Sequence, residues 1–568
     1  SIALSNSVLV FPHSIPSFRA HNNQIYPQNE NLIPRKTSKV LDVVSSPNSQ
    51  KKSLKKTHVL EGFRKQIGEN PENPQVWLDV VKHWEEKGNF QRCRDAIIGA
   101  LNYCPDNEQL LIKWIKLEEK LGNLGKARSI LGLLKDSQPE KSWKIILEGC
   151  FLEDRAGNYN TARRIFKFLT NEVGCFPNIY LEACLFEERH ENVRQSIIVA
   201  EKGLRENVTY GPLHLALVRL EQKLAFERFY DNSSSSLAEP DLSRARFALQ
   251  RAIQFVPKEL RFKIFLEWAL LEDRVGNTNL CRKAFVHSVA NCPPNLLWKV
   301  WLEGAKVELR NHMLRLDTSR ECVWQELVAR SLRDCPTKKK HQVLIEWSRM
   351  EEFCGRVDTA RSIMTKARKY AKHEWKVFLE SILLEMRANN FQNARLIAEE
   401  ALNIHRGTGR LWHLLIQLTP PEKQLDLFTL AIHEVPKSGE VWTEGARIKM
   451  KEGLLDDARK FLEFAIHFTP QYGDSFIEFL RLEMMQCGLN APTDHLELAC
   501  VNADPNYGQM WLFCKEPLHS IHHAFRNAKY ILQTLNTNGL KFFQLNTANP
   551  YDISLLIDLE DRWRLIFG

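Results

Sequence analysis

From about residue 60 onward, the chain repeats a short motif at a nearly constant spacing. Each copy has an anchor residue between two segments that show the hydrophobic period of a helix. Ala or Cys followed by Arg comes five residues after every anchor, and Glu comes four residues before five of the seven. The anchors are Gly88, Gly122, Gly157, Gly276, Gly355, Asn389 and Gly453. A register this regular predicts an array of like units, because a chain of 568 residues is too long for one ordinary core.

Each unit is expected to form two antiparallel helices joined by a tight turn. Large side chains before the anchor recur in steps of three, as in Trp143 and Ile146, which keeps them on one helix face. Gly or Asn suits the left-handed residue that ends a helix, and the small Ala or Cys lets the second helix approach closely. Two such helices bury both faces only when copies stack. We therefore predict an all-α fold, a right-handed α-solenoid of about twelve helix-turn-helix units.

The repeated Glu and Arg are predicted to be structural. They lie ten residues apart across the turn of one unit, where they could pair with each other or cap helix ends. A catalytic group would not be copied along a rod. The signature residues are Glu118, Arg128, Glu153, Arg163, Glu272, Arg282, Glu351, Arg361, Glu385, Arg395 and Arg459.

The first 58 residues differ in composition from the rest of the chain. They hold eight Lys or Arg, two acidic residues, ten serines and five prolines, so we expect a disordered basic leader. Its composition is typical of an organellar transit peptide, whereas Lys51 to Lys56 resembles a nuclear address, and a tail without address is a third interpretation. We expect a repeat domain over 59–515, then degenerate capping helices and a tail over 516–568. The thirteen cysteines, without a C-x-x-C pair, indicate a reducing compartment.

An aromatic residue ahead of a Leu-Glu pair, with Ala-Arg downstream, resembles the HAT (half-a-TPR) pattern. Trp114 to Glu118 followed by Ala127-Arg128 is one such copy. Repeat periods near 34–35 residues, such as the spacing from Gly88 to Gly122 and from Gly122 to Gly157, are also found in TPR and pentatricopeptide repeats. The residue types at the repeated positions favour HAT. HAT-repeat proteins occur mainly in RNA-processing assemblies, so the resemblance implies a function in RNA processing.

Three segments near the C-terminus resemble the closing repeats of the splicing factor family that bridges the particles of the spliceosomal tri-snRNP. They are Val435–Trp442, Phe468–Phe476 and Ala503–Trp511. The resemblance implies a non-catalytic scaffold in pre-mRNA splicing, located in the nucleus. We expect protein components to bind its concave face and the irregular segments 230–240 and 309–318. RNA is the second candidate partner. The alternative is a HAT-repeat protein of a chloroplast or mitochondrion that binds single-stranded RNA and stabilises or processes transcripts. A TPR adaptor that binds C-terminal carboxylates is a third class.

A basic stretch lies in the middle of the repeats. Residues 310–376 hold 16 Lys or Arg against nine acids, whereas the chain after residue 58 is nearly neutral, with 70 basic and 67 acidic residues. This surplus predicts a patch that meets RNA phosphates or an acidic protein tail, and a solvated helix face is the simpler interpretation. The candidate residues are Arg315, Arg320, Arg330, Arg333, Lys338, Lys339, Lys340, Lys366, Arg368, Lys369 and Lys372.

Enzyme and metal signatures were sought in the sequence and not found. The chain has no GxxxxGK[ST], HExxH, GxSxG or strand-borne GxGxxG motif, so we expect no catalytic residues, no cofactor and no small-molecule substrate. Cys514, His519, His522 and His523 lie close together in the sequence, but structural zinc sites usually contain closely spaced cysteine pairs, so we expect no metal there. No apolar run approaches the roughly 18 residues of a membrane-spanning helix.

Overall fold

The computed structural model describes residues 63, 65–132, 134, 138–231, 240–314, 323–516, 518–537 and 566. The chain forms two compact units, unit 1 up to Ile179 and unit 2 from Tyr180. Within the described ranges the regular elements are helices, and one isolated parallel bridge joins Tyr472 to Tyr507. The unit boundary falls inside a helix, at a point that the repeat pattern does not mark.

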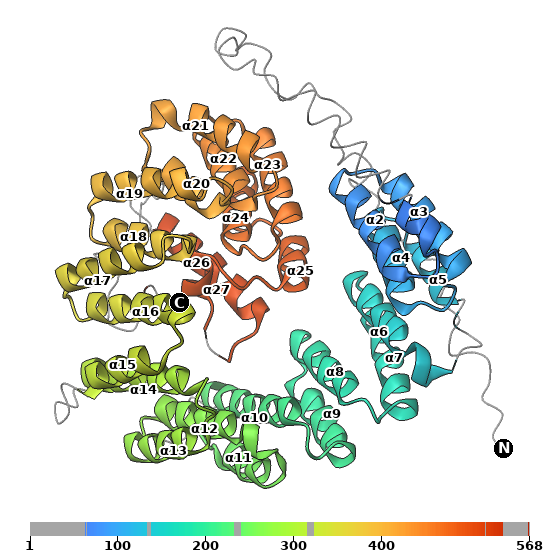
Figure 1. Ribbon diagram of the computed structural model, residues 1–568, viewed down its shortest axis with the longest axis horizontal. Coiled ribbons are helices and arrows are strands. Elements are labelled where there is room, and N and C mark those ends of the chain that lie inside the picture. Colours follow the sequence, from blue (N-terminus) through green and yellow to red (C-terminus); the bar gives the residue numbers. More distant parts are fainter. Residues whose placement is uncertain are drawn as a thin grey trace. The chain divides into compact units, whose positions relative to one another are not determined.

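Unit 1 is built from three helix pairs and the start of a fourth (Figure 1). Its helices are α2 (Pro74–Glu86), α3 (Phe90–Tyr103), α4 (Glu108–Lys120), α5 (Leu124–Gly132), α6 (Pro139–Arg155) and α7 (Tyr159–Glu172), followed by α8 (Pro177–Arg189), which runs into unit 2.

Unit 2 continues the pairing from α8 onward, and Figure 1 shows its pairs succeeding one another. The helices are α9 (Val193–Glu206), α10 (Gly211–Asp231), α11 (Ser243–Phe255), α12 (Arg261–Val275), α13 (Thr278–Asn291), α14 (Leu297–Leu314), α15 (Val323–Asp334), α16 (Lys340–Phe353), α17 (Val357–Tyr370), α18 (Trp375–Arg387), α19 (Phe391–Ile404), α20 (Gly409–Leu418), α21 (Pro421–Glu434), α22 (Gly439–Lys451), α23 (Leu455–Phe468), α24 (Asp474–Cys487), α25 (Asp494–Ala503), α26 (Gln509–Cys514) and α27 (Ile521–Thr537). Two 3₁₀ turns, η3 (Lys258–Leu260) and η5 (Thr337–Lys339), precede α12 and α16.

The predicted all-α solenoid is confirmed. From α2/α3 to α24/α25 the described helices form twelve consecutive pairs, and the short α26 begins a thirteenth with α27. The first helix of each pair is called an inner helix. In unit 2 the inner helices α12, α14, α16 and α18 line one cavity, called the hollow until its residues are given below. None of the described helices is long and apolar enough to cross a membrane.

The anchors end the inner helices as expected. All six anchor glycines have φ between 70° and 83°, and Asn389 has φ 57°. A left-handed residue here lets the next backbone N–H turn back to the helix it has just left. Asn123 N donates to the Glu118 carbonyl at 2.8 Å, for example, and Asn277 N donates to the Glu272 carbonyl at 2.9 Å. The turn therefore satisfies carbonyl groups that a helix end leaves open.

The Ala or Cys after the anchor is where the two helices of a pair meet. All seven of these side chains are inaccessible to solvent: Cys93, Ala127, Ala162, Cys281, Ala360, Ala394 and Ala458. A larger side chain would push the helices apart, because protein interiors leave few voids. The small residues thus set the close packing that the repeat requires.

The last described helices pack on the end of the array. α27 contacts α24, α25 and α26, and Ala524, Phe525 and Leu532 of α27 are buried against them. Ile566 is also buried, in a cluster that contains Trp298 and Trp324. Several predictions fall outside the described residues: the leader 1–58, Arg315 and Arg320, parts of the segments 230–240 and 309–318, and most of the tail after Thr537.

Candidate docking groove

Four of the six signature arginines bond the next helix pair rather than their own. Arg128 donates from Nε and Nη2 to the two carboxylate oxygens of Glu153, at 2.7 and 2.9 Å. The same link recurs as Arg94–Glu118, Arg246–Glu272, Arg282–Glu308, Arg361–Glu385 and Arg459–Glu483. Pairing within one unit was the alternative open from the sequence. It does not occur at these positions, because the second helix presents its Arg to the following inner helix.

Each accepting carboxylate is shielded by several donors. Glu118 is 1% exposed and receives Arg94, the amide of Asn123 at 3.0 Å and the indole of Trp114 at 3.4 Å. Burial raises the pKa of Glu118, but the hydrogen bonds from Arg94 and Asn123 outweigh burial and hold the pKa below its ordinary value. The Trp-to-Glu bond also explains the aromatic residue of the HAT-like pattern, and it recurs between Trp268 and Glu272.

Two signature residues, Arg395 and Glu351, depart from this pattern. Arg395 bonds Glu399 on its own helix at 3.0 Å, with both side chains exposed. Glu351 bonds Arg356 at 2.6 Å and also accepts from the indole of Trp347 at 3.0 Å. Arg163 is half-buried on α7.

The predicted basic patch lies at the ends of the second helices, outside the hollow. Lys338 and Lys339 are exposed in η5, and Lys366, Lys369 and Lys372 are exposed at the end of α17, with Arg368 and Lys340 half-buried. Arg330 bonds Glu326 at 2.6 Å, and Arg333 lies 3.6 Å from Asp334. Arg333, Arg368 and Lys369 lie in the last turns of α15 and α17, where the negative end of a helix favours cations, which is consistent with the solvated-face interpretation for these three.

Beside the hollow, the inner helices carry a chain of alternating charges. Lys306 of α14 lies 3.2 Å from Glu346 of α16, and Arg349 of α16 bonds Glu380 of α18 at 2.6 Å. Arg387 of α18 is bonded to Glu380 at 2.7 Å and to Glu352 at 2.6 Å. Burial raises the pKa of Glu380, but Arg349 and Arg387 together lower it to about 2. Glu380 therefore stays ionised, and the chain of charges links three successive helix pairs.

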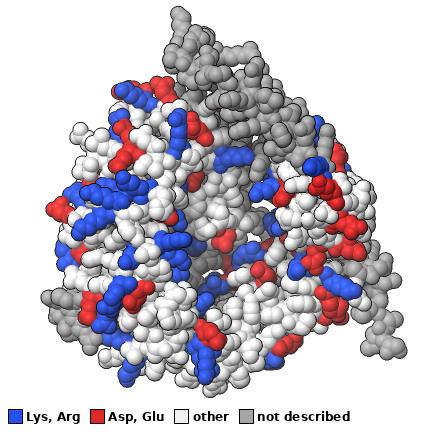
Figure 2. Space-filling model, viewed as in Figure 1, with Lys and Arg blue, Asp and Glu red and all other residues white. Residues whose placement is uncertain are grey.

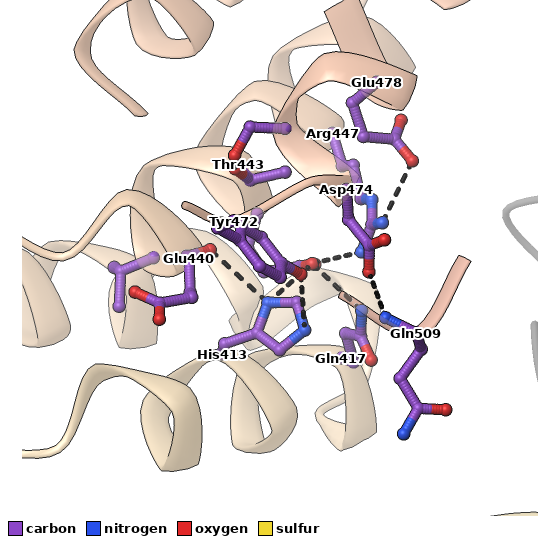
Figure 3. A network of polar contacts seen from close by, with 12 residues as sticks. His413, Gln417, Glu440, Thr443, Arg447, Tyr472, Asp474, Glu478 and Gln509 are labelled. Atoms are coloured by element: carbon purple, nitrogen blue, oxygen red, sulfur yellow. Dashed lines mark hydrogen bonds and ion pairs between the residues drawn. The ribbon is translucent and has the colours of Figure 1, made fainter. Parts of the chain in front are cut away.

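A second buried network joins α20, α22 and α24 (Figure 3). Glu444 is bonded to His413 at 3.1 Å, to the amide of Gln417 at 2.9 Å and to Arg447, which in turn bonds Glu478 at 2.9 Å. Burial raises the pKa of Glu444, and the nearby Arg447 and His413 bring it down to about 2. Such networks fix the orientation of neighbouring helices wherever every member has its partners.

The loops before two of the closing repeats each contain the same kind of hydrogen bond, from a Trp indole to a Pro carbonyl. The indole of Trp442 donates to the Pro436 carbonyl, and that of Trp511 donates to the Pro505 carbonyl, both at 2.9 Å. The spacing of six residues from Pro to Trp thus places an indole against the loops that lead into α22 and α26. Tyr507 reaches back to Glu440 of α22 at 2.7 Å, which ties two of these loops together.

A cavity of about 730 Å³ opens on the inner helices of unit 2. Part of its wall is apolar, including Leu270, Trp298, Leu302, Leu379 and Leu512. Helices α12, α14, α16 and α18 form one side, and α26 with Ile566 forms another. We call this cavity the groove. Figure 2 shows Lys and Arg residues gathered around the hollow.

Three cations of the groove have no carboxylate partner among the residues described: Lys299, Lys376 and Arg410. Lys299 lies 5.6 Å from the ring of Trp298, and Arg410 lies 4.7 Å from the ring of Tyr507. The buried Oε1 of Gln509, whose side chain points away from Asp474 in Figure 3, also lacks a hydrogen-bond partner in the described part of the chain. Cations without carboxylate partners beside an apolar wall are suited to an acidic, partly apolar ligand, and the Gln509 oxygen can accept a hydrogen bond from a backbone N–H of that ligand.

Sequence reasoning missed the groove because its cations come from distant repeats. Lys299, Lys376 and Arg410 belong to α14, α18 and α20, so no window along the sequence gathers them. The chain of alternating charges between inner helices does leave a pattern in the sequence, which the predictions did not use. Six residues before an anchor a cation recurs, and nine residues before the next anchor a Glu recurs, as in Lys116 with Glu148 and Arg349 with Glu380.

Known proteins resemble this chain over most of the repeats. The family model described as PRP6, TPR-like domain, matches residues 44–533. A TPR-containing protein of Dictyostelium discoideum is 43% identical over 474 residues, which cover 83% of this chain and 35% of that protein. The pre-mRNA-splicing factor clf-1 of Neurospora crassa is 24% identical over 234 residues, 40% of this chain and 32% of that protein.

Among solved structures, the crystal structure of yeast Tom70 is similar with a TM-score of 0.34 at 14% identity, covering 77% of this chain and 94% of that one. The chain spans about a third of the length of the two curated relatives.

Proposed function

Since this chain belongs to the PRP6 TPR-like domain family, we propose that it is a non-catalytic scaffold that assembles components of a pre-mRNA splicing ribonucleoprotein in the nucleus. The membership confirms the family resemblance inferred from the repeats. A relative is a pre-mRNA-splicing factor by name, which supports the splicing assignment. The partners are protein components of that assembly, and RNA is a further possible partner.

The observation that carries the docking role is the groove. Lys299, Lys376 and Arg410 offer positive charge beside an apolar wall and have no carboxylate partner in the described ranges. Folding has already paired the neighbouring Lys306 and Arg349, so the three remaining cations are available to a ligand. We assign the groove to a protein segment that alternates acidic and apolar side chains, because such a segment neutralises the cations and covers the wall together.

Reversing the three groove charges is expected to abolish recovery of the splicing assembly. Tagged full-length protein is expressed with Lys299→Glu, Lys376→Glu and Arg410→Glu, and spliceosomal small nuclear RNAs and proteins that co-purify are quantified. Recovery should fall by about tenfold or more, because each lost contact between charged groups is worth at least about 1.4 kcal/mol. Lys338→Glu, Lys339→Glu and Lys340→Glu form the matched control, with the same charge change on the outer edge, and should leave recovery unchanged.

Two results would count against this function. Equal recovery with the groove variant would remove the groove from the docking role. Absence of the wild-type protein from nuclear complexes, together with salt-dependent binding of single-stranded RNA that the edge variant abolishes, would favour an organellar RNA-binding protein instead.

A further inference from the structure

The turn between α26 and α27 brings together three potential metal ligands. One ligand atom each of Glu516, His519 and His523 lies within 4.8 Å of the other two. His519 Nδ1 is 3.4 Å from Glu516 Oε2, and the rings of His519 and His523 are 4.2 Å apart between centroids, tilted by 32°. Two imidazoles and a carboxylate thus lie close together.

The fold holds this cluster in place at one end. His523 belongs to the first turn of α27, and its backbone N–H donates to the hydroxyl of Ser520 at 3.2 Å, which caps the helix. Helix α27 itself packs on α24 and α25. His523 is therefore anchored to the core, while Glu516 and His519 approach it from the turn.

His523 also has an unsatisfied atom. Its Nδ1 is buried and has no hydrogen-bond partner among the described residues. A buried imidazole nitrogen without a partner is costly, and such atoms are rare unless a ligand or water satisfies them. This observation is independent of the clustering, and it concerns an imidazole of the same cluster.

The neighbouring candidates have other partners. His522 Nδ1 lies 2.8 Å from Glu497 of α25, and Cys514 is buried in the core cluster that also contains Trp511. These two residues lie close to His519 and His523 in the sequence, where the lack of paired cysteines led to the expectation of no metal site. The structure separates them and adds Glu516 instead.

We propose that Glu516, His519 and His523 bind one zinc ion, with water completing the coordination. Zinc accepts two imidazoles and a carboxylate with bonds of about 2.0–2.2 Å, so the ligand atoms must approach one another by about 1 Å. Glu516 and His519 lie between α26 and α27, outside either helix. A bound ion would tie the turn to α27 and stabilise the end of the array.

The test is a titration of the metal-free full-length chain. After chelator treatment and tag removal, Zn²⁺ is titrated near neutral pH by calorimetry, and Co²⁺ is titrated separately while its visible absorption is recorded. We expect one Zn²⁺ per chain, a higher Tm with zinc, and the Co²⁺ bands of a four-coordinate site. His519→Ala and His523→Ala should each weaken zinc binding by about tenfold or more.

His522→Ala is the matched control, since it removes an imidazole from the same helix turn but not from the cluster, and it should leave zinc affinity unchanged. Circular dichroism of each variant without zinc checks that it is folded, and Glu516→Gln, which preserves shape, serves if an alanine variant is not. No saturable zinc binding by the wild-type chain, or an equal loss in His522→Ala and His523→Ala, would overturn the proposal. Neither result bears on recovery of the splicing assembly, so the two proposals fail separately.

Discussion

Replacing Arg387 with alanine is expected to lower the local free energy of unfolding of α16 and α18 by about 3–5 kcal/mol. The Arg387 side chain is 1% exposed and donates to Glu352 at 2.6 and 2.8 Å and to Glu380 at 2.7 Å. Its removal leaves the buried Glu352 without its arginine, and it leaves Glu380 with Arg349 alone. The cost is that of uncompensated buried charge, which exceeds the net contribution of the ion pair itself.

Hydrogen exchange followed by mass spectrometry measures this loss locally, which suits an array that need not unfold in one step. Exchange in α16 and α18 should accelerate by about two to three orders of magnitude. Arg395→Ala is the control, because Arg395 and Glu399 form an exposed pair within one helix and should contribute less than about 1 kcal/mol. Similar exchange rates in both variants would contradict a structural role for the buried ion pairs of Arg387.

The second large effect is expected at Trp511. Trp511→Ala should destabilise α26 and α27 by about 3–5 kcal/mol, the usual cost of removing a large buried aromatic side chain. The side chain is fully buried and its indole donates to the Pro505 carbonyl at 2.9 Å. Gly473 packs so closely on the ring that an added Cβ would lie 2.1 Å from Trp511 Cγ.

Trp511→Phe separates packing from hydrogen bonding. It retains most of the apolar volume and loses the indole bond, so it should cost about 1 kcal/mol, well below the alanine variant. Hydrogen exchange in α24, α26 and α27 reads out both variants. An alanine variant as stable as the phenylalanine variant would show that the indole does not hold these helices together.

The repeat itself was predictable because its cause is local. A left-handed residue must end each inner helix, and a small residue must follow where the helices cross, so Gly122 and Ala127 reveal the unit without any structure. The partner of each Arg was not predictable. Glu118 and Glu153 are equally plausible partners for Arg128 in the sequence, and only the direction of the second helix decides between them.

The groove and the metal cluster escaped prediction for a different reason. Counting charges along the chain found the lysines around Lys338, which lie close together in sequence and face outward. The groove cations come from three repeats and meet only when the inner helices stack, as Lys299 and Arg410 show. Glu516 likewise becomes a ligand candidate only once the turn folds back on His523.

Among the described residues, six helix pairs are joined to the next pair by the bond from an Arg of the second helix to the following Glu. A double-mutant cycle on Arg128 tests this link. Hydrogen exchange of the full-length chain measures the local free energy of unfolding in unit 1 for each variant. Arg128→Ala and Glu153→Ala should couple by about 0.5 kcal/mol or more, and Arg128→Ala and Glu118→Ala should be additive within about 0.3 kcal/mol. Coupling of Arg128 to Glu118 with none to Glu153 would contradict the account.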